Sequence, residues 1–154
     1  MRRMVIVMAA AAMMAAAPPA AAQKKPPYWA SIRAGQALMR TGPGRNFPAL
    51  WLYRRAGLPV KVIETFESWR KVEDPDGTQG WMQVRLLSEE PMAMIVGEVE
   101  PMLVKPEAGS RIAWRAAPGV IGRLGECDAG YCRIDVGGKR GHVRQDALWG
   151  AGEP

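Results

Sequence analysis

The sequence predicts an all-β protein built from two small β-barrels in tandem. Short runs rich in β-branched and aromatic residues alternate with Gly- and Pro-containing turns, and no helical periodicity of useful length appears after residue 22. The same succession of landmarks also occurs twice, once in residues 60–82 and once in residues 120–143. Each copy is a strand, a short loop, an aromatic-led strand, a tight turn, and then Gly plus a ring residue. The length allows two domains of about sixty residues each.

The first 22 residues are expected to be a signal peptide rather than part of the fold. Arg2 and Arg3 precede an apolar run at residues 4–17, and small alanines occupy residues 20–22. This charge, apolar and small-residue order is typical of a secretory signal that is cut before Gln23. An N-terminal membrane anchor is the alternative, but two prolines end the run and alanine is only weakly apolar. We therefore expect a periplasmic or secreted protein with no stable membrane insertion after signal cleavage.

The charge of the chain is modestly basic. The net charge is +6, and loss of Arg2 and Arg3 would lower it to +4. An exported basic protein can meet anionic cell-surface polymers or acidic proteins. Nucleic acid is not an expected partner outside the cytoplasm, and most of these charges serve solubility.

The first barrel is expected over residues 32–96, after a polar tail at residues 23–31. Inward candidates alternate in a first strand that covers residues 30–39, and a Gly- and Pro-rich loop follows at residues 41–48. Pro75 presets one φ angle and Gly77 tolerates a positive one, so residues 74–77 form a tight turn, and Asp74 and Asp76 have turn roles. The other expected strands cover residues 49–55, 60–65, 69–73, 80–86 and 92–96, the last of which closes the unit.

The second barrel is expected over residues 97–150, with a tail at residues 151–154. Residues 112–115 parallel residues 51–54, and residues 117–120 parallel residues 57–60. Gly137-Gly138 is a tight hairpin turn. Residues 144–148 fit one turn of helix, after which Trp149 closes the barrel. Conserved order with low identity is what an old internal duplication looks like.

The two cysteines are expected to form a disulfide. Cys127 and Cys132 are the only cysteines, and export implies an oxidising compartment. Their spacing fits a bridge across the mouth of a hairpin loop. A redox pair or a metal pair is the alternative, but His142 is the only histidine, so a zinc site lacks ligands. We expect no metal and no other cofactor.

These landmarks resemble the bacterial Src-homology-3-like domain (SH3-like domain), in the variant common in secreted proteins of Gram-negative bacteria. The resemblance covers residues 32–150 and implies five-stranded barrels, some of which recognise peptide or cell-wall material. His142 replaces Trp81 and Tyr131 replaces Trp69 in the second unit, and the groove that reads proline-rich peptides in eukaryotic relatives is not recognisable. The residues that carry the resemblance are Met39 to Pro43, Gly57 to Val60, Trp69 to Val72, Asp76-Gly77 and Gly80-Trp81, then Gly119 to Gly122, Cys127, Tyr131 to Arg133, Gly141 and Val143.

The chain lacks the residue set that catalysis needs, so it is expected to bind rather than to catalyse. A Cys–His hydrolase needs a free thiolate beside a base, and a serine triad would need the same lone His142. Rings beside arginines favour flat or anionic ligands. The alternative is that Trp51 and Trp114 pack in the core or between the barrels. The candidate ligand residues are Trp51, Tyr53, Arg54, Trp114 and Arg115.

The expected function is non-catalytic recognition of cell-envelope material, either peptidoglycan or a partner protein. A structural or interaction protein without a small ligand is the second interpretation, and a wall hydrolase is the third.

Overall fold

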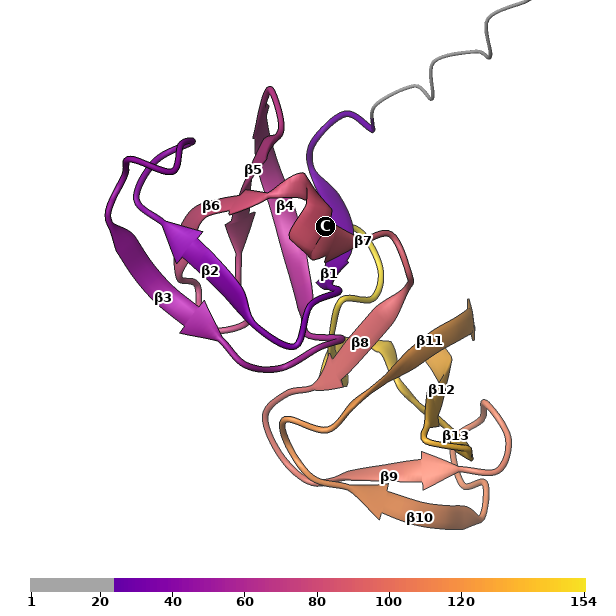
Figure 1. Ribbon diagram of the computed structural model, residues 1–154. Coiled ribbons are helices and arrows are strands. Elements are labelled where there is room, and N and C mark those ends of the chain that lie inside the picture. Colours follow the sequence, from indigo (N-terminus) through magenta and orange to yellow (C-terminus); the bar gives the residue numbers. More distant parts are fainter. Residues whose placement is uncertain (1–23) are drawn as a thin grey trace, which may run out of the picture.

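The computed structural model describes residues 24–154, and the expected signal peptide lies outside these residues. The described chain forms two antiparallel β-barrels that lie next to each other (Figure 1). Within this part of the chain, no helix is long and apolar enough to cross a membrane. The first barrel contains β1 (Tyr28–Ile32), β2 (Ala37–Arg40), β3 (Ala49–Tyr53), β4 (Pro59–Phe66), β5 (Trp69–Glu73), β6 (Gln79–Gln83), the 3-10 turn η1 (Val84–Leu86) and β7 (Leu87–Ser88). The second contains β8 (Met92–Ile95), β9 (Glu100–Leu103), β10 (Ile112–Ala116), β11 (Ile121–Asp128), β12 (Tyr131–Val136), β13 (Lys139–Arg144), η2 (Gln145–Ala147) and β14 (Leu148–Trp149).

The two barrels have the same strand order, which confirms the tandem fold. The first sheet runs β3-β2-β6-β5-β4-β1-β7, and the second runs β10-β9-β13-β12-β11-β8-β14. Each strand of one sheet therefore has a counterpart in the other. Each sheet has seven strands rather than the expected five, because a strand before the first hairpin and a two-residue strand at the end complete each unit.

Three expected boundaries are wrong. Residues 92–96 do not close the first barrel, because β8 pairs with β11 and β14 and is the counterpart of β1. The single strand expected over residues 30–39 is two strands, since the chain bends at residues 34–36. The expected tail at residues 23–31 contains most of β1, which pairs with β4.

Each barrel has its own apolar core, and one contact is repeated in both. Gly80 of β6 faces Met39, and a Cβ atom at Gly80 would lie 2.4 Å from the Met39 Cγ. Gly141 of β13 faces Met102 in the same way, with a Cβ atom 2.7 Å from the Met102 Cβ. Met39 and Met102 are fully buried. The glycine after each tight turn therefore gives a methionine room to fill the centre of its barrel.

The second barrel carries the disulfide, and its closing turn is helical as expected. Cys127 and Cys132 are bonded and directly paired across the β11–β12 hairpin, with Cα atoms 3.9 Å apart. Residues 145–147 form the 3-10 turn η2. The disulfide prediction is confirmed, and neither thiol is free.

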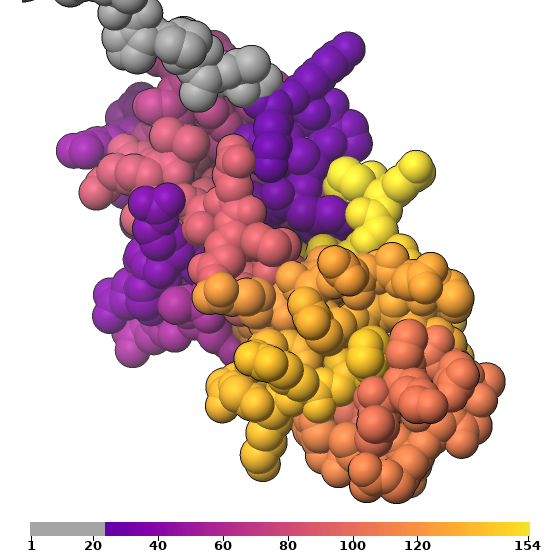
Figure 2. Space-filling model, turned by 90° about the vertical axis from the view of Figure 1, so that its right-hand side faces the viewer, coloured from indigo at the N-terminus to yellow at the C-terminus, as the bar shows by residue number. Residues whose placement is uncertain are grey.

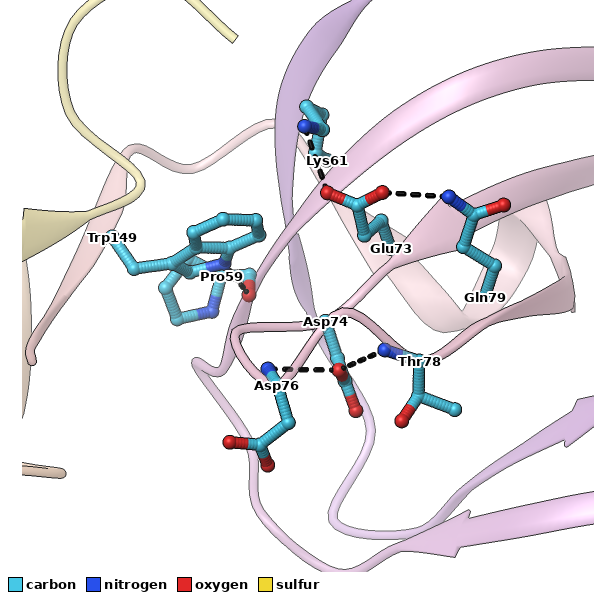
Figure 3. Close-up of polar contacts among 8 residues, drawn as sticks. All are labelled: Pro59, Lys61, Glu73, Asp74, Asp76, Thr78, Gln79 and Trp149. Atoms are coloured by element: carbon cyan, nitrogen blue, oxygen red, sulfur yellow. Dashed lines mark hydrogen bonds and ion pairs between the residues drawn. The ribbon is translucent and has the colours of Figure 1, made fainter.

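Two tryptophans join the barrels; we call Trp29 and Trp149 the aromatic seam. Trp149 of β14 donates its indole N–H to the Pro59 carbonyl oxygen of the first barrel at 2.9 Å. Figure 3 shows its ring beside Pro59 and close to Lys61, whose ammonium lies 5.6 Å from the ring centroid. The Trp29 ring meets the Trp149 ring edge-on, with centroids 4.9 Å apart. Such a packed aromatic pair fixes the orientation of the two barrels.

The C-terminal residues and the side chains of Met94 and Ile121 add further contacts between the barrels, beside the aromatic seam. Trp29 donates its indole N–H to the Gly152 carbonyl oxygen at 2.9 Å, and Ala151 packs on the second core. Residues 151–154 are therefore not a free tail; in Figure 2 the C-terminal end lies between the N-terminal segment and the second barrel. Met94 and Ile121 of the second barrel pack against the first core. Only residues 89–91 separate β7 from β8, so the barrels are held both by a short linker and by packing.

Candidate functional site

One face of the first sheet gathers large side chains from four neighbouring strands. Directly paired residues point to the same side of a sheet, and alternate residues along a strand share a face. Trp69 pairs with Gln83, Lys71 pairs with Trp81, Arg40 also pairs with Trp81, and Leu38 pairs with Leu52. Met39, Val72 and Met82 point to the opposite side, into the core. The outer face of β3, β2, β6 and β5 therefore carries two tryptophans, two leucines and two basic residues.

A groove of about 400 Å³ lies on this outer face, and we call it the outer groove. Leu38, Leu52 and Trp69 give it an apolar floor, and Trp69 is 7% exposed. Three arginines and two glutamines complete its lining together with Leu86, and no carboxylate lines it. The groove therefore combines an apolar floor with an uncompensated positive rim, which suits a ligand with a flat or apolar part and an anionic group.

The three arginines of the rim are Arg40, Arg45 and Arg85. Arg40 donates to the Phe47 carbonyl oxygen at 2.7 Å, and Arg85 donates to the Gln83 side-chain oxygen at 2.6 Å. Within residues 24–154, Arg45 has no side-chain hydrogen bond or ion pair. Arg40 and Arg85 are thus oriented by neutral acceptors, so their charges remain available to a ligand.

Trp51 is a surface residue, so the packing interpretation is wrong for it. Its side chain is 60% exposed, the largest exposure of any large apolar residue in the described chain. Phe47, Leu50 and Leu52 are also exposed. β3 lies at the edge of the first sheet, so its backbone is unpaired on one side. Trp51 pairs with Met39 and Leu52 pairs with Leu38, so Trp51 lies on an apolar edge with its side chain on the face opposite the outer groove.

Tyr53 is a core residue and not a candidate ligand contact. Its ring is buried, and its hydroxyl donates to the Asp74 Oδ2 atom at 2.6 Å. Burial raises the Tyr53 pKa above its ordinary value, and the bond to Asp74 raises it further. The other carboxylate oxygen of Asp74 accepts the backbone N–H groups of Asp76 and Thr78 (Figure 3). Asp74 therefore has the turn role that the sequence predicts and also anchors Tyr53.

The remaining candidate residues are not brought together with Trp51. Arg54 is exposed at the end of β3. Trp114 is half-buried, packs against the second core and donates its indole N–H to the Arg140 carbonyl oxygen at 3.0 Å, so the packing interpretation holds for Trp114. Arg115 is exposed on β10, which is the second barrel's counterpart of β3. The five candidates therefore divide between two barrels and between core and surface.

Sequence reasoning missed the floor and rim of the outer groove and the aromatic seam. The sequence marks Trp69 only as a landmark of the family resemblance, because the alternation of β5 does not tell which face a second layer covers. Arg45 lies in the Gly- and Pro-rich loop, where no periodicity exists. Periodicity gave no signal for Trp29, because Tyr28, Ala30 and Ile32 alternate on the core face of β1 and Trp29 lies on the other face.

The described residues offer little support for a metal or thiol site. No group of three or more His, Cys, Asp or Glu side chains gathers within residues 24–154. His142 is half-buried on β13, and its Nδ1 atom is buried without a hydrogen-bond partner. The bonded cysteines cannot supply the thiolate that a Cys–His hydrolase requires.

The fold and this site define the chain as a tandem pair of small β-barrels with a ligand-sized surface groove. The family profile described as "Bacterial SH3 domain" matches residues 33–89 and again residues 96–150. The chain therefore belongs to the bacterial SH3 domain family, with two copies of the domain.

The chain is also similar to longer solved structures. An NlpC/P60 family protein from Bacillus cereus ATCC 10987 shares 14% identity over 79% of this chain and 55% of its own, with a TM-score of 0.36. NlpC2 from Trichomonas vaginalis shares 14% identity over 82% of this chain and 49% of its own, with a TM-score of 0.35. The chain thus spans about half the length of these proteins. No curated protein matches it.

Proposed function

We propose that this chain is a non-catalytic binding module of the bacterial cell envelope that recognises peptidoglycan through the outer groove. The observation that carries the proposal is the groove itself, in which a Trp69 and leucine floor lies under three arginines with no carboxylate among the lining residues. Peptidoglycan offers sugar rings and lactyl groups with apolar faces together with peptide carboxylates. Stacking on a ring and charge-assisted hydrogen bonds to guanidinium groups suit both features.

Location in the periplasm or outside the cell is part of this proposal. It is supported by the charged, apolar and small-residue pattern of residues 1–22 and by the Cys127–Cys132 disulfide. Disulfides persist in oxidising compartments and are rare in the cytoplasm.

A pull-down on purified cell-wall sacculi tests the proposal. The wild-type chain is compared with Arg85→Glu, which reverses one charge on the rim, and with Trp51→Ala, which lies on the edge strand but on the face opposite the groove. Arg111→Glu is the matched control, because Arg111 is exposed in a loop of the second barrel outside the groove and its side chain has no partner in residues 24–154. We expect saturable binding that Arg85→Glu reduces at least tenfold and that Trp51→Ala and Arg111→Glu leave within twofold.

Two results would contradict peptidoglycan recognition. One is no saturable binding by the wild type. The other is binding that falls equally in all variants as salt rises, since exposed charges are screened beyond about 10 Å at 0.1 M ionic strength.

A protein partner is the second candidate, and the apolar edge of the first barrel favours it. Leu50, Trp51 and Leu52 are consecutive, exposed and located on the unpaired edge strand β3. An extended segment of an envelope protein could add a strand there. No sacculus binding, together with a crosslink from a photoreactive residue at position 51 to one envelope protein, would favour this function over the first.

A further inference from the structure

A second and larger cleft lies between the two barrels, on residues that the outer groove does not use. It has a volume of about 860 Å³ and is lined by both units. Arg33, which directly follows β1, lies on the first barrel's side. Arg123, Arg133 and Arg140 lie on the second barrel's side. We call this the inter-barrel cleft, and the seam contacts that orient the barrels also determine its shape.

The charges of the inter-barrel cleft do not cancel. Two carboxylates line it, and each already has a partner. Arg123 lies 2.5 Å from the Glu90 carboxylate, and the Arg140 Nε atom donates to the Asp135 Oδ2 atom at 2.8 Å. Arg140 also lowers the Asp135 pKa, so that carboxylate stays ionised and paired.

Two arginines of the cleft remain without a carboxylate, one from each barrel. Arg33 and Arg133 form no ion pair within residues 24–154, and both are exposed. The Arg133 side chain lies across Gly125, where a Cβ atom would come within 2.9 Å of the Arg133 Nε. The glycine therefore lets the Arg133 guanidinium lie along the surface of the second barrel, where it lines the cleft.

The same cleft has an apolar part. Met92, Ile121 and Leu124 are half-buried and line it. Gly57 keeps a side chain out of it, since a Cβ atom there would lie 3.1 Å from the Met92 methyl group. The lining therefore presents two separate anion-binding groups with apolar surface between the barrels.

We propose that the inter-barrel cleft binds an acidic peptide, with one carboxylate on Arg33, a second on Arg133, and an apolar side chain against Ile121 and Leu124. Guanidinium groups bind carboxylates in a planar, two-bond arrangement. A chain with a charge at every unit would bring anions against Glu90 and Asp135 and leave the apolar lining uncovered. Acidic residues separated by apolar ones match the lining better.

This site is independent of the proposed function, because the outer groove and the inter-barrel cleft share no lining residue. A ligand of the cleft would contact both barrels. The proposal therefore gives the tandem arrangement itself a role that neither barrel has alone.

Fluorescence anisotropy with a labelled peptide, Ac-Glu-Leu-Glu-Leu-Glu-NH₂, tests the proposal on the whole chain. We expect saturable binding by the wild type and binding at least tenfold weaker for the same peptide with Gln in place of Glu. Arg33→Ala and Arg133→Ala should each weaken binding about threefold to fivefold, the upper part of the range for an exposed charge pair. Arg111→Ala, which removes the same charge elsewhere, and Arg85→Ala, in the outer groove, should leave binding within twofold.

Several outcomes would overturn the proposal. Equal binding of the Glu and Gln peptides would remove the carboxylate requirement. An unchanged affinity in Arg33→Ala or Arg133→Ala, with the circular dichroism spectrum of the wild type, would place the peptide elsewhere. Competition by tripolyphosphate at the same charge concentration with equal strength would show a general polyanion site rather than one for an acidic peptide. Loss of peptide binding in Arg85→Ala would assign the peptide to the outer groove.

Discussion

The two barrels share one strand order, yet their outer faces have different chemistry. On the first barrel the paired positions hold Trp69, Trp81 and Leu52, whereas the counterpart strands of the second hold Tyr131, His142 and Arg115. The cores, in contrast, keep the same methionine and glycine contact. Packing of a methionine under a glycine constrains the inside of each barrel, while a face exposed to water can change its chemistry at small cost in stability.

The largest expected effect breaks the repeated core contact. Met39→Ala and Met102→Ala each remove a fully buried side chain and should lower the free energy of unfolding by about 2–5 kcal/mol. Urea denaturation followed by circular dichroism measures this. Because Met94 and Ile121 join the cores, we expect one transition in both variants. Two separated transitions would show that the barrels unfold independently.

The fold was largely predictable from the sequence, whereas the site was predictable only in part. The conformation of a tight turn depends on its own residues, such as Asp74 and Gly77, so the sequence placed the hairpins correctly. The start of each unit was not placed correctly, because β1 and β8 are single strands whose partners are distant in the sequence. For Trp51 the sequence left surface and packing both open, and for Trp69 it did not indicate the groove, because alternation shows that two faces exist but not which face a neighbouring layer covers.

The second barrel has a disulfide and the first has none, and mutation of the two cysteines removes this difference. The Cys127→Ser, Cys132→Ser double variant should lose roughly 2 kcal/mol of stability, because the bridge closes a short loop. The first barrel pairs Thr65 with Arg70 at the corresponding position of its hairpin. Urea midpoints with and without a reducing agent should differ for the wild type and coincide for the double variant. A wild-type urea midpoint that is the same with and without the reducing agent would contradict a stabilising role of the disulfide.

The buried hydrogen bond of the first barrel has no equivalent in the second, where Ala116 pairs with Glu100 as Tyr53 pairs with Ala37. Tyr53→Phe leaves one oxygen of buried Asp74 without its donor and should cost about 1.5 kcal/mol. The raised Tyr53 pKa also predicts a pH effect. Above pH ~10 the unfolded chain releases a phenolic proton that the folded chain retains, so the free energy of unfolding falls as pH rises.

Denaturation of the wild type and Tyr53→Phe from pH 8 to pH 11 measures this contribution. The stability difference between the two proteins should shrink above pH ~10, where the wild type loses the contribution and the variant has none to lose. A difference that stays constant across this range would contradict the assignment.

The smallest expected effect on stability concerns the faces themselves. Leu52→Arg gives the first barrel the residue of the second, and Arg115→Leu does the reverse. Both positions are exposed, so stability should change by less than about 0.5 kcal/mol. Sacculus binding should fall severalfold in Leu52→Arg and stay unchanged in Arg115→Leu. Equal effects of both substitutions would show that the two faces act as one surface.

The aromatic seam also has a consequence for the order of assembly. Its two hydrogen bonds join residues that are 123 and 90 positions apart, whereas the hairpins join near neighbours. Closing such long loops is entropically costly, so the seam should form after the hairpins. Trp149→Phe should therefore speed unfolding in stopped-flow measurements and leave the folding rate nearly unchanged. The contact that orients the barrels would then be the last to form and the first to open. The strength of the aromatic seam would therefore set the unfolding rate of the whole molecule.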